Sequence, residues 1–256
     1  MDDYNINLKE QKILRYNVDK LIVIDDFISR SHNCDVIINY NNLNIDQINK
    51  IRSKNKTSKL AIGKKYQILS KDFVQEKIYA KKRESIKNIL IFFGSSDHTL
   101  ETFKIFKLVN SFKNLEFNLV LSSFNRNLNK LKQLYKKIKN AKIHVDLDPR
   151  KFAKLIVKND LSIGSGGVNL IERLYLGLPT LVVKTSNNQK LNIDYLLKKK
   201  IIFYLGKGKN INKQIYEKKF NKIISSQKIF KNISNKSFNF YKNYSTKHLS
   251  NLFNIK

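Results

Sequence analysis

The sequence predicts an α/β protein built on parallel β-sheets, and three observations support this fold class. Short apolar runs rich in Ile, Leu and Val recur along the chain, each followed by a polar or glycine-containing turn. From residue 89 onward these runs alternate with segments of helical apolar spacing, as expected for strands joined by crossover helices. With 256 residues, 41% of them hydrophobic, the chain can bury the core of one large or two small domains.

The first part of the chain contains three runs that resemble buried strands. They lie at residues 21–24, which end in Asp25-Asp26, and at residues 35–39 and 59–63. Residues 41–58 are polar and rich in Asn and Lys, so we predict an irregular segment there. We assign residues 1–80 to a first domain. The charged residues 81–88 precede a strong new strand, and we assign them to a hinge.

Residues 89–208 are predicted to form a second α/β domain. Its strands are expected at 89–93, 117–121, 143–145, 161–163 and 180–183, and its helices at 98–112, 128–139, 151–158 and 169–176. The tail, residues 209–256, has the apolar spacing of one or two helices. We expect these helices to pack on the body of the protein.

Composition narrows the function classes. No apolar run is long enough to span a bilayer, and no leader pattern opens the chain, so we expect a cytoplasmic protein without a membrane partner. Cys34 is the only cysteine and the four histidines lack metal-ligand spacing, so we expect neither a metal nor another cofactor. The formal net charge of +30 fits a solvated basic surface or a nucleic-acid footprint. The spread of lysines along the chain and the lack of a recognisable nucleic-acid-binding motif favour the surface.

The segment Gly164-Ser165-Gly166-Gly167-Val168 lies between a predicted strand and a predicted helix. A flexible turn at this position can fold around a diphosphate, while the helix points its first N–H groups at the same place. Glu172, about one turn into the helix, is where a carboxylate can accept both hydroxyls of a ribose. The alternative is that Glu172 is an ordinary exposed helix residue. Residues 177–179, Gly-Leu-Pro, are predicted to end the helix.

Two further polar segments follow strands. Gly94-Ser95-Ser96-Asp97 comes after the strand at 89–93 and has the small residues of an anion-binding turn, although a simple turn would have the same composition. Asn188 and Gln189 belong to the polar segment 185–189, which follows the strand at 180–183. Because ligands of open parallel sheets bind beyond the carboxyl ends of the strands, this segment is expected at the same crevice. An ordinary polar loop is the alternative.

These segments, in this order and spacing, resemble the GT-B-type nucleotide-sugar family that includes the UDP-2,4-diacetamido-2,4,6-trideoxy-β-L-altropyranose hydrolases of pseudaminic acid biosynthesis. The resemblance extends to Asp3-Tyr4, Val23–Asp26, His32–Asp35 and Leu60–Leu69, and so covers roughly residues 2–205. It implies a GT-B-like fold, with a remnant of an amino-terminal Rossmann-like domain in residues 1–80 and a complete nucleotide-binding Rossmann-like domain in residues 89–208.

The resemblance also implies a reaction, in which water replaces UDP at the anomeric carbon without a metal. It implies sugar contacts for Tyr4 and Asn188. It implies UDP contacts for Gly94, Ser95, Ser96, Asp97, Gly164, Ser165, Gly166, Gly167, Val168, Glu172, Asn188 and Gln189. Ser95 stands where family members usually have a second glycine.

The family's catalytic histidine lies in a Gly-His-x-x-Arg loop, which this sequence does not contain. His32, beside Asp35, belongs to a different motif and does not replace it, so the catalytic residues are unknown. We therefore expect either a truncated or split product, with a separately encoded amino-terminal segment as a partner, or a chain whose upstream coding region was missed. Two alternatives remain: a GT-B glycosyltransferase with a UDP-sugar donor, and a non-catalytic basic binding protein.

Overall fold

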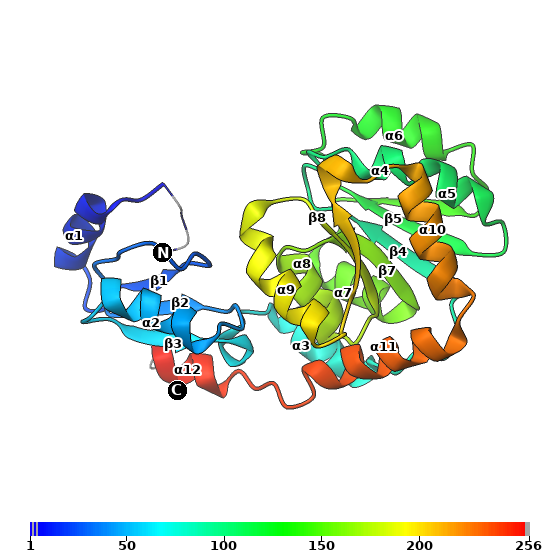
Figure 1. Cartoon of the computed structure of the whole chain (residues 1–256). Coiled ribbons are helices and arrows are strands. Elements are labelled where there is room, and N and C mark those ends of the chain that lie inside the picture. The colour runs from blue at the N-terminus through cyan, green and yellow to red at the C-terminus, as the bar shows by residue number, and fades with distance from the viewer. Residues whose placement is uncertain (2, 4, 254–256) are drawn as a thin grey trace. The chain divides into compact units, whose positions relative to one another are not determined.

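A computed structural model describes residues 1, 3 and 5–253 of the chain. The chain divides into two compact units: unit 1 comprises residues 1–68 and 243–256, and unit 2 comprises residues 69–242. Each unit contains a wholly parallel sheet with helices packed against it (Figure 1). The α/β class predicted from the sequence is confirmed.

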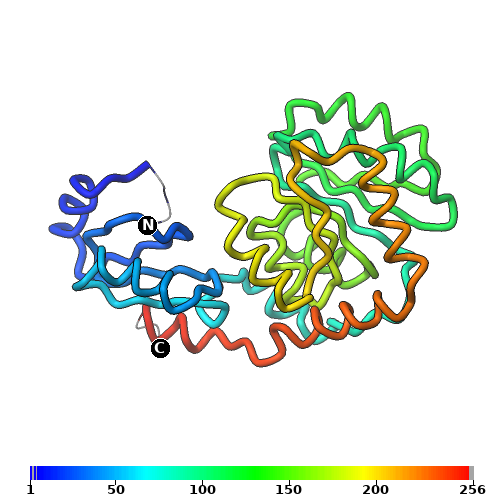
Figure 2. Tube along the Cα trace, in the orientation of Figure 1, coloured from blue at the N-terminus to red at the C-terminus, as the bar shows by residue number. Residues whose placement is uncertain are grey.

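Unit 1 is a three-stranded sheet in the order β1 (Ile22–Ile24), β2 (Val36–Asn39), β3 (Lys59–Ile62). Alternate residues of β2 point to opposite faces. Ile37 packs with Ile51 of helix α2 (Ile45–Lys54), whereas Val36 and Ile38 pack with Leu252 of helix α12 (Lys247–Phe253). Helix α12, red in Figure 2, therefore covers one face of the first sheet.

Helix α2 corrects the prediction that residues 41–58 are irregular. The Asn44 side chain accepts from the Gln47 backbone N–H at 2.9 Å, and the Gln47 side chain accepts from the Asn44 backbone N–H at 3.0 Å. This reciprocal capping box starts the helix in a segment with few apolar residues. Asn7 and Glu10 start helix α1 (Leu8–Tyr16) in the same way.

Unit 2 has a six-stranded parallel sheet in the order β6-β5-β4-β7-β8-β9. The strands are β4 (Asn88–Phe92), β5 (Glu116–Leu121), β6 (Ala141–Val145), β7 (Leu161–Ser165), β8 (Thr180–Lys184) and β9 (Phe203–Lys207). Numbered along the chain within the unit, this is the 3-2-1-4-5-6 order of the Rossmann fold. The order reverses between β4 and β7, which are therefore the strands that flank the expected ligand crevice.

Helices cover both faces of the second sheet (Figure 1). One face packs against α5 (Phe106–Ser111), α6 (Leu128–Tyr135) and α10 (Lys213–Ile224). The other face carries α7 (Pro149–Lys158), α8 (Val168–Tyr175) and α9 (Lys190–Lys198). The remaining helices are α3 (Lys71–Glu76), α4 (Glu101–Lys104) and α11 (Gln227–Phe240). None of the helices in the described part of the chain is long and apolar enough to cross a membrane.

The division between the units lies earlier than the expected hinge at residues 81–88. Phe73 is buried and packs edge-to-face on Phe152 of unit 2, with ring centroids 6.2 Å apart. The buried Arg83 guanidinium donates to the carbonyls of Leu176 at 3.0 Å and Gly177 at 2.8 Å. Residues 69–88 thus belong to unit 2, although their charged composition suggested a linker. The tail, residues 209–256, was expected to pack on the body of the protein as one or two helices. It is divided between the units, since residues 209–242 belong to unit 2 and residues 243–256 to unit 1.

Candidate nucleotide-binding site

Gly164 allows an arginine to pack beneath the glycine-rich turn. A Cβ atom at Gly164 would lie 2.1 Å from the Phe92 carbonyl oxygen of the neighbouring strand and 2.3 Å from Nη1 of Arg173. Both approaches are far inside van der Waals contact, so the position accepts only glycine in this arrangement. Gly164 lies within β7 and is buried, and it contributes to the turn through packing.

Arg173 holds the turn from below. Its guanidinium donates to the Ser165 carbonyl at 2.5 Å, to Oγ of Ser162 at 2.9 Å and to the Asn169 carbonyl at 3.0 Å. Complete burial lowers the pKa of Arg173 to about 9, an effect that the nearby Glu172 carboxylate opposes. The guanidinium therefore remains charged at neutral pH, and places a fixed cation directly under the turn.

The amino terminus of α8 is open to an anion. Gly167 is its N-cap and supplies no side chain, whereas α1, α2, α7, α10 and α11 are each capped by an Asn, Asp or Ser side chain. Helices α5, α6 and α9 also lack a side-chain cap, but only α8 starts at the glycine-rich turn. A Cβ at Gly167 would meet only Nε2 of Gln189, at 3.7 Å. The N–H groups of the first turn of α8 thus face accessible space, and the helix dipole adds positive potential.

The turn after β4 lies beside the turn after β7. Gly94 has a φ of +92°, which favours glycine, and its Cβ position is 3.9 Å from Oγ of Ser165. Ser95 and Ser96 are exposed. The structure therefore brings the two predicted small-residue turns together at the point where the strand order reverses.

Asp97 stabilises the turn after β4 from within. Its buried carboxylate accepts from the backbone N–H groups of Glu101 and Thr102, both at 2.9 Å. Burial raises the pKa of Asp97, and these hydrogen bonds partly offset the rise. Because both carboxylate oxygens accept backbone bonds, Asp97 is placed to shape the turn, not to face a ligand directly.

The segment 185–189 contacts both turns. Oε1 of Gln189 accepts from the backbone N–H of Thr185 at 2.9 Å and from that of Gly166 at 3.3 Å. A ring nitrogen of His98, from the loop after β4, lies 2.8 Å from the Thr185 carbonyl. The segment therefore sits at the predicted crevice, and Gln189 holds the glycine turn. Asn188 beside it is half-buried.

Glu172 lines a small cavity next to the glycine turn. The cavity has a volume of about 190 Å³, and its walls are formed by Phe73, Phe92, Val120, Leu147, Pro149, Phe152, Asn169 and Glu172. Oε2 of Glu172 accepts from Nδ2 of Asn169 at 2.8 Å. Burial raises the pKa of Glu172, and the Asn169 bond opposes this effect. A carboxylate beside a largely apolar cavity suits a ligand with a flat apolar ring attached to hydroxyl groups.

Several residues of this cavity are absent from the sequence-based prediction. Asn169 belongs to the glycine-rich segment, and its position three residues before Glu172 is the spacing at which helix side chains meet. Phe73, Leu147 and Phe152 come from distant segments, and only the fold brings them together. Tyr4, the predicted sugar contact, lies outside the described residues. No three His, Cys, Asp or Glu side chains within residues 1, 3 and 5–253 are grouped as metal ligands would be.

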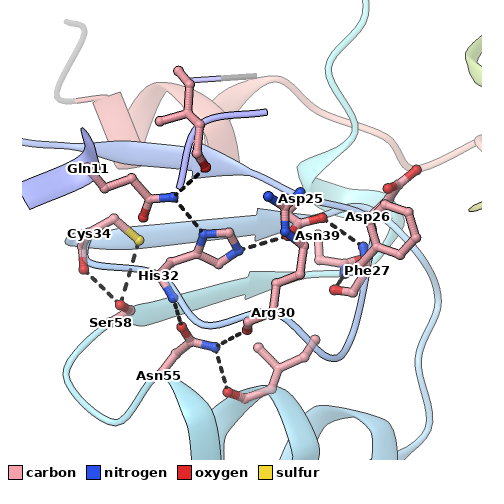
Figure 3. Close-up of polar contacts among 12 residues, drawn as sticks. Gln11, Asp25, Asp26, Phe27, Arg30, His32, Cys34, Asn39, Asn55 and Ser58 are labelled. Carbon is pink, nitrogen blue, oxygen red and sulfur yellow. Dashed lines mark hydrogen bonds and ion pairs between the residues drawn. The ribbon is translucent and has the colours of Figure 1, made fainter. Parts of the chain in front are cut away.

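His32, in unit 1, is part of a buried polar network (Figure 3). Its Nε2 lies 2.8 Å from Oδ2 of Asp25, and both side chains are almost fully buried. The Gln11 amide oxygen accepts from the Asn33 backbone N–H, so its Nε2 faces Nδ1 of His32 at 3.3 Å as a donor. These contacts favour the arrangement in which Nδ1 accepts from Gln11 and Nε2 donates to Asp25. Asp35, next to His32 in the motif, instead pairs with Arg15. His32 therefore orders the loop after β1.

Comparisons of the sequence with known proteins assign no family to the chain. No protein-family model matches it. An uncharacterised protein of Methanocaldococcus jannaschii is 35% identical over 144 residues, which are 54% of this chain and 29% of that protein. The chain thus spans less than a third of this relative's length.

Solved structures resemble the chain over most of its length. MurG of Acinetobacter baumannii has a TM-score of 0.64 at 14% identity, covering 96% of this chain and 75% of MurG. The UDP-GlcNAc 2-epimerase of Neisseria meningitidis, solved with UDP-GlcNAc, has a TM-score of 0.61 at 15% identity, covering 86% of this chain and 62% of the epimerase. WaaG, a glycosyltransferase of lipopolysaccharide biosynthesis, has a TM-score of 0.55 at 12% identity, covering 97% of this chain and 80% of WaaG. The chain therefore has the GT-B-like fold of glycosyltransferases and UDP-GlcNAc 2-epimerases, as the sequence resemblance implied.

Proposed function

We propose that unit 2 binds the UDP moiety of a UDP-sugar. The observation that carries this proposal is the convergence of two small-residue turns, an α8 amino terminus without a side-chain cap and the Glu172 cavity at one edge of the sheet. The diphosphate would accept from the N–H groups of the first turn of α8 and from the turn at Ser95-Ser96. Glu172 would accept from the ribose hydroxyls, and the base would enter the cavity.

The volume of the cavity agrees with this assignment. At about 190 Å³ it is smaller than the roughly 300–1,000 Å³ of pockets that enclose a whole small molecule, so it would hold only one part of the ligand. Phe92 and Phe152 line it with aromatic surface, and their rings are 5.2 Å apart in an edge-to-face contact. A pyrimidine ring would pack against such walls, while the more polar parts of the nucleotide remain at the mouth.

The reaction that we propose is cleavage of the bond between the anomeric carbon and the diphosphate. Water would form the new bond to carbon, and the bond electrons would leave with UDP, whose growing charge the α8 amino terminus and the buried Arg173 would stabilise. The sugar, a diacetamido-trideoxy hexose, is proposed from the sequence resemblance. The same resemblance implies a Gly-His-x-x-Arg loop supplied from outside residues 1–256.

A glycosyltransferase is the second candidate, in which an acceptor hydroxyl replaces water. The likeness to WaaG, a glycosyltransferase, favours this candidate. Fold does not separate the two reactions, because the identity of the attacking oxygen depends on residues outside the nucleotide site.

Calorimetry with UDP tests the binding proposal. Glu172→Gln keeps the shape of the side chain but loses its charge, so UDP affinity should fall at least about tenfold, as expected for a lost charge-assisted hydrogen bond. Glu116→Gln is the matched control, since Glu116 is exposed at the first residue of β5, away from the carboxyl edge. Absence of UDP binding, or equal affinity in the Glu172→Gln variant and the parent, would refute the proposal.

Product analysis tests the reaction. The chain would be incubated with UDP-sugars, alone and together with a separate polypeptide carrying the Gly-His-x-x-Arg segment. UDP and free sugar in equal amounts would support hydrolysis, and UDP released only when an acceptor becomes glycosylated would support transfer. A UDP-sugar that is bound but unchanged under all of these conditions would contradict both reactions.

A further inference from the structure

A second hollow of unit 2, which we call the lysine pocket, differs in chemistry from the Glu172 cavity. It lies at the carboxyl ends of β8 and β9 and has a volume of about 510 Å³. Its walls are formed by Thr99, by residues 184–187 and by residues 207–210. The volume is within the range of pockets that bind small molecules.

The lining of this pocket is basic and rich in hydrogen-bond donors. Lys184, Lys207 and Lys209 bring three ammonium groups, while the other positions supply hydroxyl, amide and backbone groups. None of its described lining residues is acidic or aromatic. Such a set of groups would bind an oxyanion whose attached group also makes hydrogen bonds.

The floor of the lysine pocket is fixed. Gly208 is buried, and a Cβ atom there would lie 2.8 Å from Oε1 of Glu101 and 3.0 Å from Oγ1 of Thr99. The Glu101 carboxylate is neutralised by Lys104 at 2.7 Å and accepts from the Tyr216 hydroxyl at 2.6 Å, so the floor is not negative. The hydroxyl of Thr99 is buried against Gly208 and makes no hydrogen bond within the described part of the chain, so it belongs to the floor and does not face the open space of the pocket.

We propose that the lysine pocket binds the phosphate group of a phosphorylated sugar-sized molecule. The pocket is larger than an isolated phosphate ion requires, and its donors surround a space that a sugar ring would share. Thr185 connects it to the candidate UDP site, because this residue lines the pocket while its backbone N–H donates to Gln189. The lysine pocket and the Glu172 cavity are neighbours that share no lining residue.

The general basicity of the protein calls for a matched comparison. Another hollow of similar volume, about 520 Å³, is lined by Lys130, Lys136 and Lys137 together with Gln133 and Leu134. It has the same number of lysines, but they come from α6 and the residues just after it. Substitution of these three lysines therefore measures how much surface charge alone contributes to phosphate binding, because they come from one stretch of the chain and not from several segments around a pocket.

The experiment titrates the full chain with glucose 6-phosphate, inorganic phosphate and glucose by calorimetry, with and without saturating UDP. We expect glucose 6-phosphate to bind more tightly than inorganic phosphate, glucose not to bind, and UDP not to compete. Lys184→Gln/Lys207→Gln/Lys209→Gln should weaken binding at least about tenfold, and Lys130→Gln/Lys136→Gln/Lys137→Gln by less than about twofold.

Four results would overturn the assignment. They are no binding of glucose 6-phosphate by the parent, equal weakening by the two triple variants, displacement by UDP, and inorganic phosphate binding as tightly as the sugar phosphate. Circular dichroism of every variant shows whether the protein is folded, whether or not UDP binds. UDP affinity, measured separately, keeps a failure here distinct from a failure of the UDP proposal.

Discussion

Substitution by alanine should have different effects at two glycines that are three residues apart: Gly164→Ala should lower stability, and Gly167→Ala should lower UDP affinity. At Gly164 a Cβ atom would be 2.1 Å from the Phe92 carbonyl oxygen and 2.3 Å from Nη1 of Arg173, well inside the roughly 3.5 Å at which carbon packs against other heavy atoms. Either β4 and β7 separate, or the guanidinium leaves Ser162 and loses its buried hydrogen bonds. Each route disrupts a buried charged network, for which we expect a loss of at least about 3 kcal/mol in the free energy of unfolding.

Gly167→Ala is the matched substitution. The backbone at Gly167 has φ −79° and ψ −157°, which alanine adopts, and the new methyl group would meet only Nε2 of Gln189 at 3.7 Å. We expect the free energy of unfolding to change by less than about 0.5 kcal/mol. UDP affinity should nevertheless fall at least about tenfold, since the methyl group would occupy the approach to the first N–H groups of α8.

Urea unfolding followed by circular dichroism measures the first effect, and calorimetry with UDP measures the second. If the free energy of unfolding of Gly164→Ala lies within about 1 kcal/mol of that of the parent, the backbone clash is relieved at little cost and the predicted packing constraint is wrong. If Gly167→Ala binds UDP as tightly as the parent does, the predicted role of the α8 amino terminus is wrong.

Three buried or partly buried polar residues, Glu172, Asp97 and His32, give four further predictions. Burial raises the pKa of Glu172, so this carboxylate becomes protonated at a higher pH than an ordinary glutamate, whose pKa is 4.5. As pH is lowered, UDP affinity should therefore begin to fall before pH 4.5 is reached, and Glu172→Gln should remove this dependence. A carboxyl whose pKa is raised in the folded state loses stability as pH rises through that pKa, so Glu172→Gln should stabilise the unliganded protein at pH 7 by on the order of 1 kcal/mol in thermal unfolding. Asp97→Asn replaces one acceptor oxygen with a donor and should cost about 1 kcal/mol, with weaker UDP binding as the adjacent turn loosens. His32→Ala removes one hydrogen-bond donor of the buried Asp25 carboxylate, which keeps Arg30 and the Phe27 backbone N–H as partners, and should cost about 2 kcal/mol, seen as faster hydrogen exchange in residues 21–40 with unchanged UDP affinity. Equal exchange in parent and variant would contradict this role of His32.

The sequence predicted the second sheet well because its strands are apolar runs bounded by turns. It did not predict β9, whose run Phe203–Lys207 is interrupted by Gly206, or helices α1 and α2, which contain few apolar residues. For both helices a local indication was present, the Asn-x-x-Glu/Gln capping pattern at Asn7 and Asn44.

Contacts between segments that are far apart in the chain were not predicted from the sequence. Residues 243–256 return to unit 1 because Leu252 fits against Val36 and Ile38, a contact between segments more than 200 residues apart. The site shows the same limit. The glycine turn and Glu172 were predicted from local pattern, whereas the bond from Gln189 to Gly166 and the aromatic walls of the cavity depend on the strand order.

Residues 164–173 combine several features that lower the stability of the protein when no ligand is bound. The segment contains glycines at three positions, a helix start without a side-chain cap, a carboxylate with a raised pKa and a fully buried guanidinium. Some comparable groups of unit 2 have partners, since Asp97 accepts from the first backbone N–H groups of α4 and Glu101 pairs with Lys104. Helices α5, α6 and α9 also start without a side-chain cap, so it is the combination of features that distinguishes residues 164–173. Local departures from stable design tend to occur where a ligand supplies the missing interactions. An anion at the turn would pair with the open N–H groups and with the field of Arg173, and ribose hydroxyls would satisfy Glu172. UDP should consequently stabilise unit 2 more than its buried surface alone would suggest.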